Sequence, residues 1–86
     1  MTPNFRTLDL NLLRVFDEIM AERSLTRAAR NLNLTQPAVS NALRRLREAL
    51  GDDLVQRSGQ GMAPTPRARA IWPAVREALE DRKSVV

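Results

Sequence analysis

The fold is decided by one stretch of this chain, Ala28-Ala29-Arg30-Asn31-Leu32-Asn33-Leu34-Thr35-Gln36-Pro37-Ala38-Val39-Ser40. A helix is expected to begin after Ser24, whose side chain suits the N-cap position, and to continue into this stretch. Asn33 can adopt the left-handed conformation that ends such a helix. Thr35 then starts a second helix as its N-cap, and Pro37 is tolerated because it lies in the first turn. The stretch therefore predicts two helices joined by a tight turn.

The second of these helices, expected over residues 35–50, has two contrasting faces. Its apolar residues are spaced by four, three and four positions and form a core-facing stripe of Val39, Leu43, Leu46 and Leu50. The opposite face is polar and consists of Pro37, Ser40, Asn41, Arg44, Arg45 and Glu48, with Gln36 and Arg47 at its margin. Gly51 is suited to end the helix.

A helix is expected on the N-terminal side of this pair, over residues 8–23, with Asp9 as its N-cap. On the C-terminal side, the short runs 54–57 and 62–65 flank a glycine-containing loop and predict a β-hairpin. An isolated two-stranded hairpin is marginally stable in water, so this one is expected to pack on the helices.

A fourth helix is expected to start at Thr65 as the N-cap, with Pro66 at the first helical position that proline prefers. Pro73 lies well inside this helix and should kink or divide it, because proline lacks the backbone N–H and clashes with the preceding turn. The predicted fold is mainly α: a winged helix-turn-helix with a three-helix core, a two-stranded β-wing and a C-terminal helix.

Composition excludes several function classes. A chain of 86 residues is expected to form one domain, because domains usually contain about 100–200 residues. It contains no Cys and no His, which excludes disulfides and removes the usual ligands of transition metals. No apolar run is long enough to span a membrane. We therefore expect no metal site, no cofactor and no membrane association.

The positive charge is concentrated in two blocks. Lys and Arg number 14 against 10 Asp and Glu, for a net charge of +4. No acidic residue falls between Glu22 and Glu48, or between Asp53 and Glu77, and these two blocks contain ten of the positive residues. Such basic blocks are typical of proteins that bind a polyanion.

Together, the layout and the charge predict binding to double-stranded DNA. The second helix of a helix-turn-helix presents polar side chains to base edges in the major groove. The residues expected to read bases are Gln36, Pro37, Ser40, Asn41 and Arg44. Those expected to contact phosphates or the minor groove are Thr26, Arg27, Thr35, Arg45, Arg57 and Gln60. Ser24 and Arg47 are further candidates for phosphate contact. The alternatives are that Ser24 is only a helix cap, that Arg45 and Arg47 are solvated, and that Arg57 is a cross-strand partner.

The same residues resemble a known family. The stretch 28–40, its continuation Leu43-Arg44-Arg45-Leu46-Arg47 and the later run Asp53-Leu54-Val55-Gln56-Arg57 are similar to LysR-type transcriptional regulators. The sequence around Pro64-Thr65-Pro66 is most similar to the branch of this family that includes nodulation and aromatic-degradation regulators. The resemblance extends from about Leu8 to about Leu79.

The resemblance implies a division of the chain into a DNA-binding domain, 1–65, and a linker helix, 66–86, with an effector-binding domain missing. It implies a bacterial cytoplasmic protein, associated with the nucleoid, that regulates transcription in response to a small molecule. It further implies a homodimer through the linker helix, a tetramer in the full-length protein, and RNA polymerase as a candidate partner. The expected dimerisation stripe is Ala68, Ile71, Trp72, Val75 and Leu79.

Two alternatives come from other function classes. A helical protein-interaction module would use the same exposed helix or the stripe to bind a partner protein, and its binding would not depend on salt. A small enzyme would need catalytic groups, and Asp9, Asp17 and Glu18 are candidate acids without a nucleophile or a phosphate-binding loop beside them. We therefore expect no catalytic residues. The stripe also has a simpler interpretation, as ordinary core.

Overall fold

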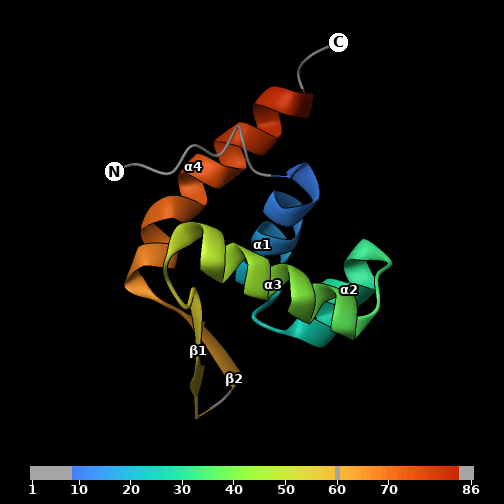
Figure 1. Ribbon diagram of the computed structural model, residues 1–86, viewed down its shortest axis with the longest axis vertical. Coiled ribbons are helices and arrows are strands. Elements are labelled where there is room, and N and C mark those ends of the chain that lie inside the picture. The colour runs from blue at the N-terminus through green and yellow to red at the C-terminus, as the bar shows by residue number, and fades with distance from the viewer. Residues whose placement is uncertain (1–8, 60, 84–86) are drawn as a thin grey trace.

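A computed structural model describes the backbone of residues 9–59 and 61–83, and side chains as far as residue 80. The elements follow one another as α1 (Leu10–Glu22), α2 (Leu25–Leu32), α3 (Gln36–Leu50), β1 (Val55–Ser58), β2 (Gly61–Pro64) and α4 (Pro66–Lys83). Helices α1, α2 and α3 pack on one another, the hairpin projects beyond α3, and α4 runs alongside α1 (Figure 1). The mainly helical fold and the two-stranded wing confirm the predicted architecture.

The helix boundaries confirm the predicted caps. Asp9 accepts a hydrogen bond from the Asn11 amide at 2.8 Å, and Ser24 accepts one from the Arg27 amide at 3.2 Å. Thr35 does the same for the Ala38 amide at 3.2 Å. Each of these oxygens satisfies an amide that the first helical turn leaves without a partner.

A left-handed residue follows each of the helices α1, α2 and α3. Asn33 (φ 59°) and Gly51 (φ 65°) were predicted for this role, whereas Arg23 (φ 55°) was not. Arg23 ends α1, and its amide donates to the Ile19 carbonyl at 2.7 Å. A non-glycine residue in this conformation carries an energetic cost, so tertiary packing of α1 and α2 stabilises it.

One hydrophobic core lies between the four helices. The stripe of α3 is buried as predicted, with Val39 and Leu46 fully inaccessible. Phe16 and Ile19 of α1 lie against it at 1% exposure. Burial of these side chains supplies the main stabilisation of the domain, at about 1.5–3 kcal/mol for each large apolar side chain.

The wing is an antiparallel hairpin whose register pairs Val55 with Pro64 and Arg57 with Met62. Its first strand begins one residue later than the predicted run 54–57. Leu54 is the reason, since it adopts a left-handed conformation (φ 68°) with its side chain fully buried. The wing therefore turns away from the helices immediately after Leu54.

Helix α4 bears on two expectations. It runs without a break through Pro73, so the helix is not divided at this residue, while the other expected effect, a kink, stays a prediction. Of the stripe predicted for dimerisation, Ala68 and Val75 have 0% exposure within the core of this chain, which agrees with the simpler interpretation of these two residues as ordinary core. The stripe members Ile71, Trp72 and Leu79 are partly buried and pack against the same core.

Trp72 joins α4 to α1 through a polar contact. Its indole Nε1 donates a hydrogen bond to Asp17 Oδ1 at 2.7 Å. The Arg76 Nε lies 3.9 Å from the same oxygen, and its guanidinium carbon is 5.7 Å from the centre of the Trp72 ring. Because a buried indole N–H needs an acceptor, Asp17 accounts for the orientation of the ring.

Candidate nucleic-acid interface

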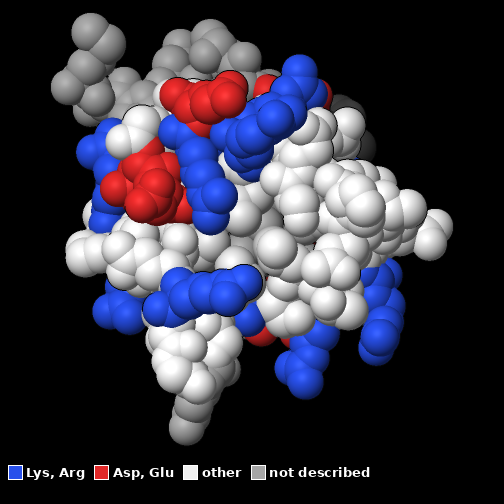
Figure 2. Space-filling model, turned by 60° about the horizontal axis from the view of Figure 1, so that its bottom comes forward, with Lys and Arg blue, Asp and Glu red and all other residues white. Residues whose placement is uncertain are grey.

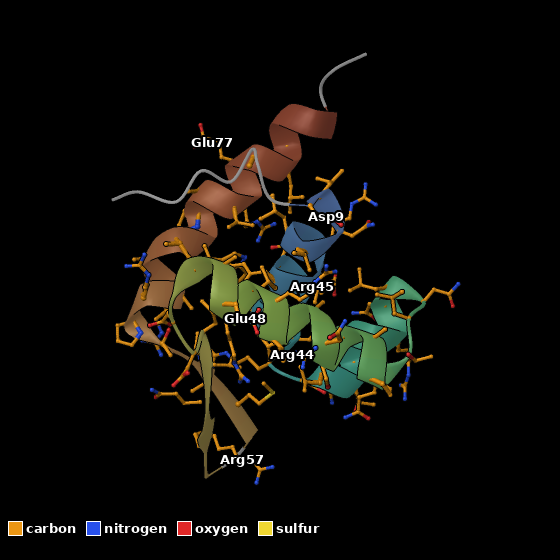
Figure 3. All side chains as sticks on the ribbon, in the orientation of Figure 1. Asp9, Arg44, Arg45, Glu48, Arg57 and Glu77 are labelled. Carbon is orange, nitrogen blue, oxygen red and sulfur yellow. The ribbon has the colours of Figure 1, made fainter. Side chains whose placement is uncertain are left out.

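The polar face of α3 is open to solvent. All five residues predicted to read bases (Gln36, Pro37, Ser40, Asn41 and Arg44) are exposed, as are Thr35 and Arg45. Their exposure follows from the burial of the opposite stripe, because the two faces of one helix point in opposite directions. Figure 3 shows Arg44 and Arg45 on α3, and Arg57 on the hairpin that projects beyond this helix.

Two of these side chains contact each other. The Arg44 Nη2 donates a hydrogen bond to Asn41 Oδ1 at 2.7 Å, one helical turn earlier. This contact limits the guanidinium to fewer orientations and leaves its other N–H groups available. A guanine edge offers the two acceptors that suit such a guanidinium.

A groove runs between the start of α2, the start of α3 and the hairpin, with a volume of about 870 Å³. Five predicted DNA-contacting residues line it together: Thr26, Arg27, Gln36, Ser40 and Arg57. The further candidates Ser24 and Arg47 line it as well, whereas Pro37, Asn41, Arg44 and Arg45 lie outside the groove, on the exposed face of α3 beside it. The fold therefore brings residues of three elements, separated in the sequence, around one opening.

The groove is rich in arginine. Arg23, Arg27, Arg47 and Arg57 line it, with Glu22 as the acidic residue among the lining side chains. Figure 2 shows Lys and Arg side chains on both sides of the hairpin on this face, while most of the visible acidic side chains gather toward the opposite edge. A concave surface lined by one sign of charge attracts a polyanion.

The wing carries its own cation. Arg57 is exposed on β1 and extends outward near the far end of the hairpin (Figure 3). Gln60, the other residue predicted to contact DNA from the wing, lies outside the described residues. Of the two wing residues predicted to contact DNA, Arg57 is therefore the one whose position the structure describes.

The start of α2 has amides and a cation at one place. Ser24 acts as the cap, which agrees with the simpler of its two interpretations, and Thr26 and Arg27 are exposed beside it. Helix starts favour anions because their amides and the helix dipole point outward. The Thr35 oxygen likewise caps α3, which leaves its hydroxyl hydrogen to donate elsewhere.

Sequence reasoning missed Arg23 and Gln56, which also line the groove. Arg23 belongs to the first acid-free block, so charge pointed to it, but nothing local indicated that it ends a helix in a left-handed conformation. Arg47 was a candidate for phosphate contact, and its Nε donates instead to the Asp53 carbonyl at 2.9 Å. The charge of Arg47 therefore lies at the groove, while its hydrogen bond stabilises the loop that contains Asp53.

The candidate catalytic acids have structural partners. Asp9 caps α1, Asp17 accepts from Trp72, and Glu18 accepts from Asn31 Nδ2 at 3.0 Å. Among residues 9–59 and 61–80, no group of three or more acids could hold a metal ion. No helix in the described part of the chain has the length and apolarity needed to cross a membrane.

Known proteins are similar to this chain in sequence. The family model for the bacterial regulatory helix-turn-helix proteins of the lysR family matches residues 10–69. Nodulation protein D 1 of Rhizobium meliloti (strain 1021) is 57% identical over 75 residues, which cover 87% of this chain and 24% of that protein. The chain thus spans about a quarter of the length of this relative.

Solved structures share the fold. The probable transcriptional regulator PA0477 from Pseudomonas aeruginosa superimposes with a TM-score of 0.85 at 44% identity, over 95% of this chain and 28% of that one. The DNA-binding domain of BenM, in a complex with catB site 1 DNA, gives a TM-score of 0.82 at 29% identity, over 88% of this chain and 85% of that one. With the exposed face of α3, the arginine-lined groove and the wing, these matches show that the chain belongs to the LysR family of bacterial regulatory helix-turn-helix proteins and forms its DNA-binding domain.

Proposed function

We propose that this domain binds double-stranded DNA sequence-specifically, with α3 in the major groove and the wing on the flanking backbone or in the minor groove. The observation that carries the proposal is the shared groove: the start of α3, the start of α2 and Arg57 of the wing surround one arginine-lined opening. A duplex phosphate backbone following this groove would place the exposed face of α3 against base edges.

Within this arrangement the residues have different roles. Gln36, Ser40 and Arg44 carry amide, hydroxyl and guanidinium groups that pair with base edges, and Pro37 and Asn41 border them on the same exposed face. Thr26, Arg27, Thr35 and Arg45 would hold phosphates, as would Arg57 unless it enters the minor groove.

The proposal extends to a symmetric dimer. Since Ala68 and Val75 are buried within this chain, the contact between two copies would use the partly exposed Ile71, Trp72 and Leu79. Control of transcription in response to a small-molecule effector, a tetramer, contact with RNA polymerase and a place in the bacterial cytoplasm at the nucleoid are further parts of the proposal. They concern the whole length of such regulators, of which this chain matches about a quarter.

Selection from a random duplex pool, followed by titration of the selected duplex at two salt concentrations, tests the proposal. We expect the logarithm of the affinity to fall by about 0.9 for each neutralised phosphate per tenfold increase in salt. A scrambled duplex should bind more weakly with a similar salt slope. No binding to any duplex at low salt would refute the proposal, and partner binding that is insensitive to salt would favour a protein-interaction module.

A further inference from the structure

The joint between α3 and the wing contains a partly buried hydrogen-bond network that sequence patterns did not indicate. It involves residues 51–54, which connect α3 to β1, and Thr65, which connects β2 to α4. Thr65 is buried at 4% exposure, and it is the polar residue among those buried in the described part of the chain. Polar groups at such positions are retained with their hydrogen-bond partners, so the network indicates a positional role.

Asp52 is the centre of this network. Its Oδ2 accepts the Thr65 hydroxyl at 2.7 Å and the Leu54 amide at 2.9 Å. The Thr65 Oγ1 in turn accepts the Ala68 amide at 3.1 Å, and the Thr65 amide donates to the Leu54 carbonyl at 2.9 Å. One carboxylate oxygen thus connects the residue before the wing to the residue after it.

Leu54 shows why this connection matters. It is a non-glycine residue in the left-handed region (φ 68°), which L-amino acids adopt at an energetic cost. The Asp52 carboxylate holds its amide, and burial of its side chain holds the rest of the residue. Since β1 begins at the next residue, the backbone angles of Leu54 set the direction in which the wing leaves the domain.

Helix α3 is connected to the same joint through Arg47. The Arg47 carbonyl accepts the amides of Gly51 and Asp52 at 2.8 and 3.3 Å, and its Nε donates to the Asp53 carbonyl. The loop is therefore held by α3 on one side and by the start of α4 on the other. The hairpin beyond Val55 projects from this joint, as Figure 1 shows.

We propose that Asp52 is a positioning residue for DNA recognition: its carboxylate sets the angle of the wing relative to α3, so that Arg57 reaches the duplex while α3 occupies the groove. This inference rests on the proposed DNA binding. Asp52 itself is acidic and would not contact phosphates, so its contribution to affinity passes through the wing.

The test compares Asp52→Ala with Asp53→Ala on the selected duplex. Both substitutions remove one negative charge at neighbouring positions, which by itself favours DNA binding, but in the described structure the Asp53 side chain makes no hydrogen bond. We expect Asp52→Ala to bind about tenfold more weakly than Asp53→Ala, since the loss of one contact commonly changes affinity by this factor. Asp52→Asn, which keeps an acceptor oxygen, should recover most of the loss.

A double-mutant cycle with Arg57→Ala separates positioning from general damage. If Asp52 acts through the wing, its replacement should change affinity by less than about threefold once Arg57 is absent. An equal loss in both backgrounds would overturn the proposal, as would equal affinity of the Asp52→Ala and Asp53→Ala variants.

Residual dipolar couplings of the free protein give a readout without DNA. In the parent protein, the amides of 55–58 and 61–63 should fit the same alignment frame as α3, whereas in Asp52→Ala they should not. The amides of α1 to α3 serve as the control for folding in both proteins. If no variant binds DNA, the proposed function fails while the couplings still test the joint, and an unchanged wing orientation in Asp52→Ala overturns the inference.

Discussion

Gln36 and Arg57 are both exposed and both line the groove, yet their positions differ in kind. Gln36 is the first residue of α3, where a side chain can reach base edges. Arg57 lies on the projecting hairpin, where backbone phosphates and the minor groove are the available partners. An amide pairs with particular bases, whereas a phosphate contact is independent of sequence.

We expect Gln36→Ala to cost about 1–3 kcal/mol of binding free energy on the selected duplex. The cost should be much smaller on a duplex altered at the base pair that Gln36 contacts. The reason is that only the correct base completes the hydrogen bonds of the amide. Affinities measured on a set of single-base variants of the duplex would test this.

Arg57→Ala is the matched variant at the wing. It should weaken binding to all of these duplexes by similar factors and reduce the salt slope by about one unit. Equal losses on every duplex for both substitutions would contradict the assigned roles.

The Asp52 carboxylate should also make the free energy of unfolding depend on pH. Hydrogen bonds from the Thr65 hydroxyl, and next from the Leu54 amide, hold the pKa of its carboxyl below the usual value, although desolvation acts against them. Because the pKa is lower in the folded than in the unfolded chain, this stabilisation is present above about pH 4, the usual value of an aspartate, and is lost as pH falls through the folded pKa.

Urea unfolding of the parent protein and of Asp52→Asn measures this contribution. The difference in unfolding free energy should be present at pH 7 and should shrink as the pH is lowered below about 4. Asp53→Asn is the control for removing a charge nearby. A difference that stays constant, or grows, at acid pH would contradict the assignment.

At the scale of elements, α4 carries an unfavourable residue in its interior. Pro73 is exposed, lacks the N–H that would donate to the Arg69 carbonyl, and is nevertheless accommodated in a continuous helix. Packing of Val75 and Trp72 on α1 offsets this cost, which shows that tertiary contacts rather than propensity maintain the helix.

We expect Pro73→Ala to raise the free energy of unfolding by about 1–3 kcal/mol, because it restores a helical hydrogen bond without removing a buried side chain. Thermal unfolding followed by circular dichroism would measure it. Pro66→Ala is the control, since proline is favoured at the first helical position. A Pro73→Ala variant no more stable than the parent would mean that the ring has a packing role in α4.

At the scale of the whole molecule, the charges are segregated. The acids of α1 are occupied in contacts between helices, with Asn31 donating to both Glu18 and Glu22 at 3.0 Å. Four arginines of the acid-free blocks, Arg23, Arg27, Arg47 and Arg57, line the groove, and Figure 2 shows Lys and Arg side chains on both sides of the hairpin. A modest net charge of +4 thereby becomes a concentrated positive surface.

The proposed dimer predicts a dependence on half-site spacing. Two copies related by symmetry should bind cooperatively when half-site centres are about 34 Å, one helical turn, or a multiple of it apart. Inserting about 5 base pairs should abolish cooperativity, because it moves one half-site to the opposite side of the duplex, and inserting about 10 should restore it.

Gel-shift titrations over such a spacing series, with a single half-site as the control, would measure the cooperativity. Independent binding of the two copies at every spacing would contradict the proposed symmetric dimer. It would not contradict the proposed recognition of base pairs by a single domain.

The sequence by itself determined the caps, the helical stripes and the polar face of α3, because each depends on residues within one or two turns of one another. Ser24, Thr35 and Gly51 are examples whose positions the structure confirms. The exact start of the wing was not predictable, since the left-handed Leu54 is held by a carboxylate and by the core. Of the site, the residue types on α3 were predictable, but their grouping around one groove with α2 and the wing was not.

Tertiary structure alone decided how the elements are joined. Trp72 finds its acceptor 55 positions away in Asp17, and Asp52 finds the Thr65 hydroxyl 13 positions away. The same packing placed Ala68 and Val75 in the core of this chain instead of on a free face. The physical reason is that periodicity shows which side of a helix is apolar, while the partner that covers it depends on how the whole chain folds back on itself.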